Sequence, residues 1–110
     1  MGADAGDGEI AVKAIGDIKK RKMKAFYSAM KAYILTPDEL AEEGKKLEAA
    51  GLDEFTIMDS AGTMLPDEVA AYTEKLCRAV TIPVAFHGHN NLGMSAANAV
   101  AAWENGASIL

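Results

Sequence analysis

The chain has 110 residues, half of them hydrophobic and a quarter charged, with a formal net charge of −5. This length suits one modest domain and falls short of the roughly 250 residues of a closed eight-stranded barrel. No basic, aromatic-rich segment suggests nucleic-acid binding, and no apolar run is long enough for a membrane span or placed like a signal peptide. We therefore expect no nucleic-acid or membrane partner. Because Cys77 is the only cysteine, no internal disulfide can form, which is typical of a reducing compartment, and we expect a cytoplasmic protein.

Hydrophobic periodicity and capping signals predict alternating helices and strands. The clearest helix follows Thr36, an N-cap candidate, with Pro37 at the first helical position, Glu39 completing a capping box and Gly51 as the C-terminal stop. In chain order, the predicted elements are a loop at 4–9, a helix over 9–22, a strand over 25–30, a helix from 37, a strand over 54–59, a helix from 66, a strand over 84–87, a helix from about 92 and the start of a strand at 109–110.

The apolar positions of each helix predict its buried side. The expected buried residues are Ile10, Ala14, Ile15 and Ile18 in the first helix, Leu40, Gly44, Leu47 and Ala50 in the second, and Val69, Tyr72, Leu76 and Val80 in the third. We also expect Met94 and Trp103 to pack against the sheet and Cys77 to be a small core residue.

A repeat of 29 residues underlies the alternation. It separates Pro37 from Pro66 and connects the ends of three apolar runs at Met30, Asp59 and Gly88. A strand followed by a helix is the simplest unit of this size, and consecutive units of this kind build a parallel sheet with crossover helices. The predicted fold class is therefore α/β, in one domain over residues 1–110 whose active residues gather at the carboxyl ends of the strands.

The most informative motif is the segment 86–93, Phe-His-Gly-His-Asn-Asn-Leu-Gly, at the end of the last complete strand. Side chains two residues apart share a face of a strand, so His87 and His89 can converge on one ion while Gly88 leaves room between them. This spacing indicates a metal site. The alternative is a pair of hydrogen-bonded polar residues beside a turn.

Three motifs occur in order along the chain. They are Lys-Ala-Tyr at 31–33, Asp-Ser-Ala-Gly at 59–62 followed by Met-Leu-Pro at 64–66, and the paired-histidine segment followed by Ala97-Asn98 and Gly106-Ala107. Together they resemble 4-hydroxy-2-oxovalerate aldolases, which belong to a group of metal-dependent barrel lyases related to 3-hydroxy-3-methylglutaryl-CoA lyase. The resemblance covers nearly the whole chain and is weakest before Met23. It implies a partial TIM (β/α)8 barrel, from the fourth helix to the start of the eighth strand, with about three complete strand-helix units.

The resemblance implies reversible cleavage of 4-hydroxy-2-oxopentanoate to pyruvate and acetaldehyde, with a divalent metal as Lewis acid. The metal is expected to be Mn²⁺, although imidazole and carboxylate ligands also suit Mg²⁺, Co²⁺ or Zn²⁺. By their motif positions, His87 and His89 correspond to metal ligands, His87 also lies beside the substrate, and Ser60 contacts the carboxylate of the 2-keto acid. An acylating acetaldehyde dehydrogenase is the partner that the resemblance implies for the complete enzyme.

Other functional groups of these aldolases have no matching position here. The third metal ligand, an aspartate in an Arg-Asp-Gly motif, is missing from the sequence, as are the adjacent catalytic arginine, a histidine base and a tyrosine. Asp59 is either a substitute ligand or, more in keeping with its place beside Ser60, a residue that supports the site or caps the backbone. Asn90 either orients the metal site or caps the following helix.

Two other interpretations stay open. The related acyl-CoA-condensing synthases share a paired-histidine strand, but more often in a His-Cys-His-Asn-Asp form than in the His-Gly-His-Asn-Asn form present here. Alternatively, the chain is a non-catalytic fragment that binds metal or serves in assembly. Because a short parallel sheet leaves two open edges and one bare face, we expect the isolated chain to self-associate or to be partly unfolded. Because the aspartate ligand, the arginine and the base are missing, we expect the chain to be inactive alone.

Overall fold

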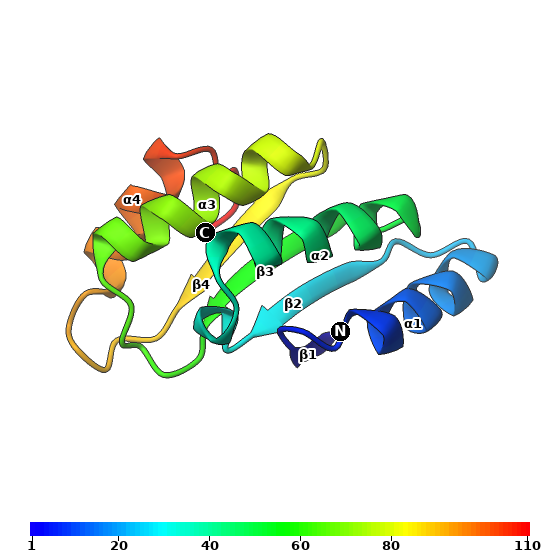
Figure 1. Cartoon of the computed structure of the whole chain (residues 1–110), viewed down its shortest axis with the longest axis horizontal. Coiled ribbons are helices and arrows are strands. Elements are labelled where there is room, and N and C mark those ends of the chain that lie inside the picture. The colour runs from blue at the N-terminus through cyan, green and yellow to red at the C-terminus, as the bar shows by residue number, and fades with distance from the viewer.

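The computed structural model describes residues 1–110. Strands and helices alternate along the chain (Figure 1). The elements are β1 (Gly2–Asp4), α1 (Gly8–Lys20), β2 (Phe26–Met30), the short 3-10 helix η1 (Ala32–Ile34), α2 (Pro37–Ala49), β3 (Glu54–Asp59), α3 (Pro66–Ala79), β4 (Val84–Gly88) and α4 (Ser95–Glu104). The predicted alternation is confirmed, and the strand predicted over 54–59 coincides with β3. No helix of the fold has the length and apolarity needed to cross a membrane.

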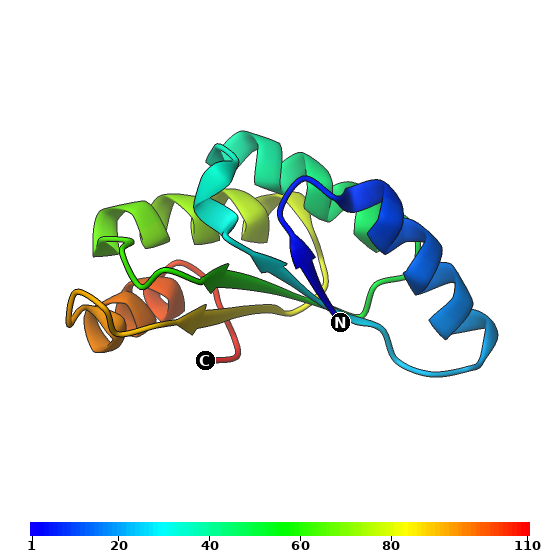
Figure 2. The same ribbon diagram turned by 90° about the horizontal axis from the view of Figure 1, so that it is seen from below.

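The four strands are all parallel and lie in the order β1-β2-β3-β4, so their order in the sheet follows the chain. Ile109 forms a single parallel bridge with Ala85 of β4, at the place where the start of a further strand was predicted. The helices follow one side of the curved sheet (Figure 2). This is the arrangement of consecutive units in a (β/α)8 barrel, whose helices form the outer ring.

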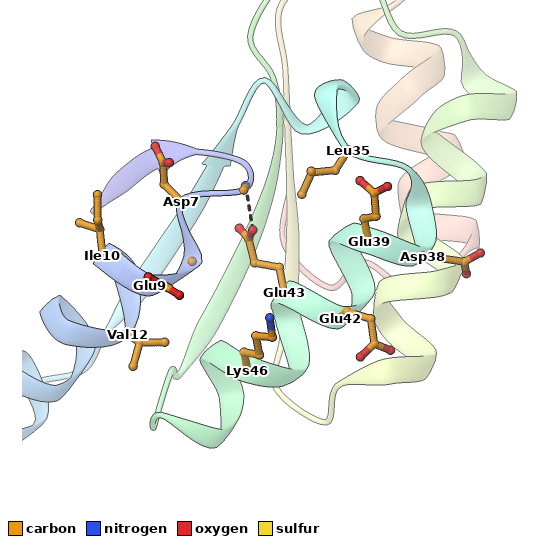
Figure 3. Close-up of a pocket in the computed structure, with 12 residues that line it drawn as sticks. Asp7, Glu9, Ile10, Val12, Leu35, Asp38, Glu39, Glu42, Glu43 and Lys46 are labelled. Carbon is orange, nitrogen blue, oxygen red and sulfur yellow. Dashed lines mark hydrogen bonds between the residues drawn. The ribbon is translucent and has the colours of Figure 1, made fainter.

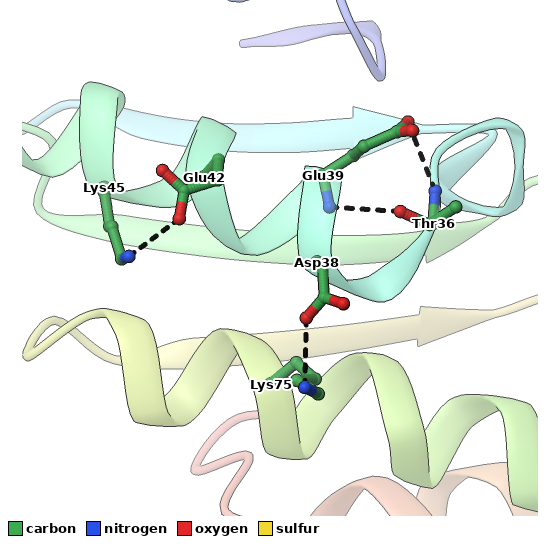
Figure 4. Close-up of polar contacts among 6 residues, drawn as sticks. All are labelled: Thr36, Asp38, Glu39, Glu42, Lys45 and Lys75. Carbon is green, nitrogen blue, oxygen red and sulfur yellow. Dashed lines mark hydrogen bonds and ion pairs between the residues drawn. The ribbon is translucent and has the colours of Figure 1, made fainter.

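The start of α2 confirms the capping signals read from the sequence (Figure 4). The hydroxyl of Thr36 accepts a hydrogen bond from the backbone N–H of Glu39 at 3.2 Å, and the carboxylate of Glu39 accepts one from the N–H of Thr36 at 3.4 Å. Asp38, in the same turn, forms an ion pair with Lys75 of α3 at 3.0 Å. These contacts fix where α2 begins and align it beside α3.

The core lies between the sheet and its helices. Tyr27 and Phe55, on neighbouring strands, meet edge to face with ring centroids 5.2 Å apart, and both are fully buried. Gly44 lets α2 and α3 approach closely, because a Cβ at this position would lie 2.5 Å from Leu76. The predicted buried residues of α2 and α3 are buried, apart from Ala50, which is partly buried.

The opposite face of the sheet, which faces the inside in a closed barrel, is covered by no element of this chain. Alternation along β2 places Phe26, Ser28 and Met30 on this face, and the side chain of Phe26 is 47% exposed. Met58 of β3 pairs in register with His87 of β4 and shares this inner face with it. His87, at the carboxyl end of β4, therefore lies on the inner face of the sheet.

The structure corrects two features of the predicted sheet. Residues 2–4, expected to end in a loop, form β1 and pair with β2, giving a fourth strand that three residues of sequence could not signal. The 29-residue step holds between β3 and β4, where Asp59 pairs with Gly88. Between β2 and β3 the offset is 28, since Ala29 pairs with Ile57. Met30 and Asp59 consequently point to opposite faces of the sheet.

The predictions for Ile10, Met94 and Trp103 were wrong. Ile10 and Trp103 are 67% and 65% exposed, and Met94 is 38% exposed. Ile10 lies on α1 and Trp103 on α4, the first and last helices of the row, each of which has a packed neighbour on one side only. Amphipathic spacing marks these residues as apolar positions, but burial also requires a neighbouring element.

Candidate active site

Parallel pairing brings the carboxyl ends of all four strands to one edge of the sheet. Asp4 ends β1, Lys31 follows β2, Ser60 follows β3, and His87 and His89 lie at the end of β4. The predicted site residues are therefore gathered at the edge that forms the active-site face of such barrels.

The two imidazoles lie side by side at the end of β4. Their ring centroids are 4.9 Å apart, the rings are inclined by 67°, and both residues are exposed. Nδ1 of His89 lies 2.9 Å from the carbonyl oxygen of Asp59. Because a carbonyl only accepts, this nitrogen carries the proton, and the lone pair of the neutral ring is on Nε2. A histidine whose other nitrogen is held by a carbonyl is the usual form of a metal ligand in proteins.

Asp59 accepts hydrogen bonds with both its carboxylate and its backbone carbonyl. The side chain is fully buried, and its oxygens accept hydrogen bonds from the N–H groups of Thr63 at 3.2 Å and Met64 at 3.0 Å. The carbonyl meets His89. The Asp59 carboxylate is thus directed into the turn before α3, which is the backbone-capping geometry and not that of a metal ligand.

Ser60 connects the ends of β2 and β3. Its hydroxyl oxygen accepts a hydrogen bond from the backbone N–H of Lys31 at 2.8 Å, which leaves the hydroxyl hydrogen free to donate to a ligand. Lys31 has a left-handed backbone, with φ of 53°, and its ammonium group forms an ion pair with Asp4 at 2.9 Å. The hydrogen bond with Asp4 raises the pKa of Lys31, so the lysine stays charged at this edge.

Asn90 lies between the histidine pair and α4. Its side-chain oxygen accepts a hydrogen bond from the N–H of Ser95, the first residue of α4, at 3.2 Å. The structure thus places Asn90 in contact with the start of the helix, as one of the two sequence interpretations proposed, and brings its amide oxygen to the backbone of α4.

Gly62 allows two site loops to touch. It has a left-handed φ of 65°, and a Cβ there would lie 2.7 Å from the backbone nitrogen of Asn91 and 2.7 Å from the carbonyl oxygen of His89. Its carbonyl accepts the N–H of Leu92 at 3.1 Å. The loop after β3 and the loop after β4 are therefore in direct backbone contact, which only glycine permits at this position.

We expect Gly62→Ala to lower the free energy of unfolding by about 2–4 kcal/mol and to weaken Mn²⁺ binding, because the new methyl group displaces the backbone of His89. Gly93→Ala is a matched control. Gly93 has a similar φ of 74° but nothing within 4 Å of a built Cβ, so it should incur only the backbone cost of about 1–2 kcal/mol. Urea unfolding and calorimetry measure both effects. Equal losses in the two variants would contradict the close contact.

The donor set of the site suits a divalent ion in part. His87 and His89 supply two imidazoles, but the chain brings no group of three His, Cys, Asp or Glu side chains together. Asp4 is engaged by Lys31 and lies three strands away from β4, about 14 Å at the usual strand spacing. The two histidines thus fit a metal as two ligands of a set that the chain itself does not complete.

A cavity of about 700 Å³ lies elsewhere, between α2 and the segment that joins β1 to α1 (Figure 3). The buried carboxylate of Glu43 accepts hydrogen bonds from the N–H of Gly6 at 2.8 Å and from the hydroxyl of Tyr27 at 2.9 Å. Burial, followed by the bond to Glu43, raises the pKa of Tyr27 far above its usual range, so its hydroxyl remains a donor. This cavity contains no predicted site residue, and Glu43 connects it to Gly6 in the loop after β1.

Two residues of this region had no role assigned from the sequence. Asp4 belongs to the strand that was not predicted, and no signal in so short a segment identifies it. Asn98 is 1% exposed and donates to the carbonyl of Met64 at 2.8 Å. A polar residue on the apolar stripe that also holds Ala101 and Ala102 was a signal that could have found it.

Comparisons with known proteins show the family of the chain. A family model described as HMGL-like matches residues 8–110. The "4-hydroxy-2-oxovalerate aldolase" of Moorella thermoacetica is 42% identical over 104 residues, covering 94% of this chain and 31% of that protein. Its namesake from Streptomyces griseus is 40% identical over 111 residues, covering the whole chain and 33% of that protein. The chain spans about a third of the length of these relatives.

Solved structures show the same fold at low sequence identity. The HMG-CoA lyase of Brucella melitensis superposes with a TM-score of 0.83 at 22% identity, over 93% of this chain and 38% of that one. The carboxyl transferase domain of Rhizobium etli pyruvate carboxylase gives 0.78 at 21% identity, over 89% and 18%. The fold and the parallel arrangement of its strand ends define part of a TIM barrel. The chain belongs to the HMGL-like family.

Proposed function

We propose that these 110 residues are the part of a metal-dependent aldolase that supplies two metal ligands, and that the complete enzyme cleaves 4-hydroxy-2-oxopentanoate to pyruvate and acetaldehyde. The observation that carries the proposal is the hydrogen bond from His89 Nδ1 to the carbonyl of Asp59, inside a motif shared with the aldolases. This bond leaves Nε2 of His89 for a metal. His87, 4.9 Å away between ring centroids, supplies the second imidazole.

The roles of the individual residues follow from their contacts. His87 and His89 hold the ion, which we take to be Mn²⁺, and when bound the ion acts as a Lewis acid that stabilises negative charge on the 2-keto acid. Ser60 donates its free hydroxyl hydrogen to the substrate carboxylate, while the N–H of Lys31 fixes the hydroxyl oxygen. Asp59 and Asn90 orient the site through the backbone. The same resemblance supports association of the complete enzyme with an acylating acetaldehyde dehydrogenase, which consumes the aldehyde.

A hybrid barrel tests this function. In the experiment, residues 1–110 replace the matching span of the Moorella thermoacetica relative. We expect Mn²⁺-dependent release of pyruvate from 4-hydroxy-2-oxopentanoate. Activity that survives metal removal would contradict the proposal, as would a folded hybrid that does not cleave this substrate.

Ser60→Ala in the same hybrid tests the carboxylate contact. We expect oxalate and pyruvate to bind about tenfold more weakly, since one hydrogen bond to a charged group is lost, while Mn²⁺ affinity stays within twofold. Calorimetry with each ligand separates the two effects. Lys45→Ala is the matched surface control, because Lys45 is exposed and its ammonium group pairs with Glu42 of the same helix. Unchanged oxalate binding would remove Ser60 from the substrate site.

The bare inner face predicts self-association of the isolated chain. Phe26 on that face and Ile10 and Trp103 on the outermost helices expose large apolar side chains, and both sheet edges are open. Burying these surfaces favours contact between copies. We therefore expect sedimentation at micromolar concentration to show oligomers. A compact monomer with a cooperative thermal transition would contradict this expectation.

A further inference from the structure

Asn98 of α4 is almost completely buried, with 1% of its surface exposed, and only half of its amide is used. Its Nδ2 donates to the carbonyl of Met64 at 2.8 Å, while its Oδ1 is buried without a partner. An aliphatic side chain would fill the same space without leaving an unpaired acceptor, which is costly in a protein interior. The bond to Met64 is therefore the contact that accounts for an amide at this position.

That bond leads to the histidine pair in two further steps. The N–H of Met64, whose side chain is also buried, donates to the carboxylate of Asp59 at 3.0 Å. The carbonyl of Asp59 then accepts Nδ1 of His89 at 2.9 Å. Three hydrogen bonds, all anchored on buried groups, thus run from the body of α4 to the exposed imidazole.

The same loops are held together by backbone contacts. Besides the bond from Leu92 to Gly62, the N–H of His89 lies 3.4 Å from the carbonyl of Asp59, which also accepts the N–H of Gly62 at 3.2 Å. Because the N–H of Met64 donates to the carboxylate of Asp59, we expect a movement of the loop at Met64 to shift the carbonyl of the same residue. That carbonyl is the group that sets which nitrogen of His89 carries the proton.

We propose that Asn98 is a positioning residue, which holds the Met64 loop so that the carbonyl of Asp59 keeps His89 in its Nδ1–H form with Nε2 free for a ligand. The inference rests on the proposed function in taking His89 as a metal ligand, but the tautomer of His89 is measured without metal. A residue in a helix outside the strand-end edge thereby controls the orientation of a ligand histidine.

Asn98→Leu tests the proposal in the 110-residue chain without metal. Leucine keeps the volume and removes both the donor and the unpaired acceptor. Nitrogen-15 NMR at pH 8.5 reports which ring nitrogen of His89 is protonated. We expect the Nδ1–H form to predominate in the unmodified chain and to fall below half in Asn98→Leu. Hydrogen exchange at the Leu92 amide should become about tenfold faster as the loops separate.

Thr73→Val is the matched control. Thr73 is fully buried and also donates to a backbone carbonyl, that of Val69 at 2.7 Å, but this bond lies within α3 and does not reach the site loops. We expect Thr73→Val to leave the His89 tautomer and the Leu92 exchange rate unchanged. The same change in both variants, or no change in Asn98→Leu, overturns the proposal.

A second variant and a parallel Mn²⁺ titration complete the experiment. If Asn98→Leu does not fold, Asn98→Ser replaces it, because serine is too short to reach the Met64 carbonyl, and the same outcomes apply. Mn²⁺ titration of the unmodified chain is recorded in parallel. Absence of Mn²⁺ binding would count against the proposed function alone, whereas an unchanged tautomer in the Asn98 variant would count against the positioning role alone.

Discussion

With Mn²⁺ and 4-hydroxy-2-oxopentanoate, the isolated 110-residue chain is expected to release pyruvate several orders of magnitude more slowly than a complete barrel. Under the proposed function the chain supplies His87, His89 and Ser60, but the third metal ligand, the arginine and the base that the family resemblance implies have no counterpart in its sequence. Groups that stabilise charge in the transition state typically contribute factors of 10²–10³ each, and their loss is not compensated by binding alone.

A coupled assay for acetaldehyde measures this difference, and the hybrid barrel that contains the same residues is the control. Turnover by the isolated chain near about one per second, a typical enzymatic rate, would contradict the prediction. Such a result would direct attention to the charged pair of Lys31 and Asp4, which lies at the same edge as the histidines.

His87→Ala and His89→Ala are each expected to lower Mn²⁺ affinity of the isolated chain by about 100-fold or more. The two imidazoles lie side by side at the strand ends, and no group of three His, Cys, Asp or Glu side chains comes together in the chain. A single remaining imidazole holds a divalent ion little better than a free side chain. Calorimetry or Mn²⁺ electron paramagnetic resonance gives the affinity.

Ser60→Ala is the control for these variants, because Ser60 lies at the same edge of the sheet but contacts the backbone of Lys31. Its Mn²⁺ affinity should stay within twofold of that of the unmodified chain. Mn²⁺ binding that persists unchanged in both histidine variants would show that the ion is held elsewhere, and the assignment of the site would be wrong.

The strands and helices with strong local signals were predictable. β3 was placed at both of its ends because an apolar run lies between turn residues, and α2 because Thr36, Pro37 and Glu39 satisfy the backbone of its first turn. The alternation of strands and helices also predicted that His87 and Ser60 lie at the same end of the sheet, because the carboxyl ends of parallel strands are on the same side.

The register of the sheet was less predictable. A repeat of 29 residues describes β3 and β4, yet β2 and β3 are offset by 28, because pairing depends on how side chains of neighbouring strands pack and not on the period of the motif. β1 has no local signal of its own. It exists because the edge of β2 offers backbone groups to which residues 2–4 can pair.

The sequence by itself determined the alternation of elements, the placement of two histidines on one strand end and the family motifs that surround them. Only the tertiary structure decided how His89 is oriented, that the carboxylate of Asp59 points into a turn, and that Asn98 is connected to both. Local patterns fix secondary structure because capping and periodicity act within a few residues. The orientation of a ligand depends on hydrogen bonds between segments about 30 residues apart, which arise only when the strands and helices pack together.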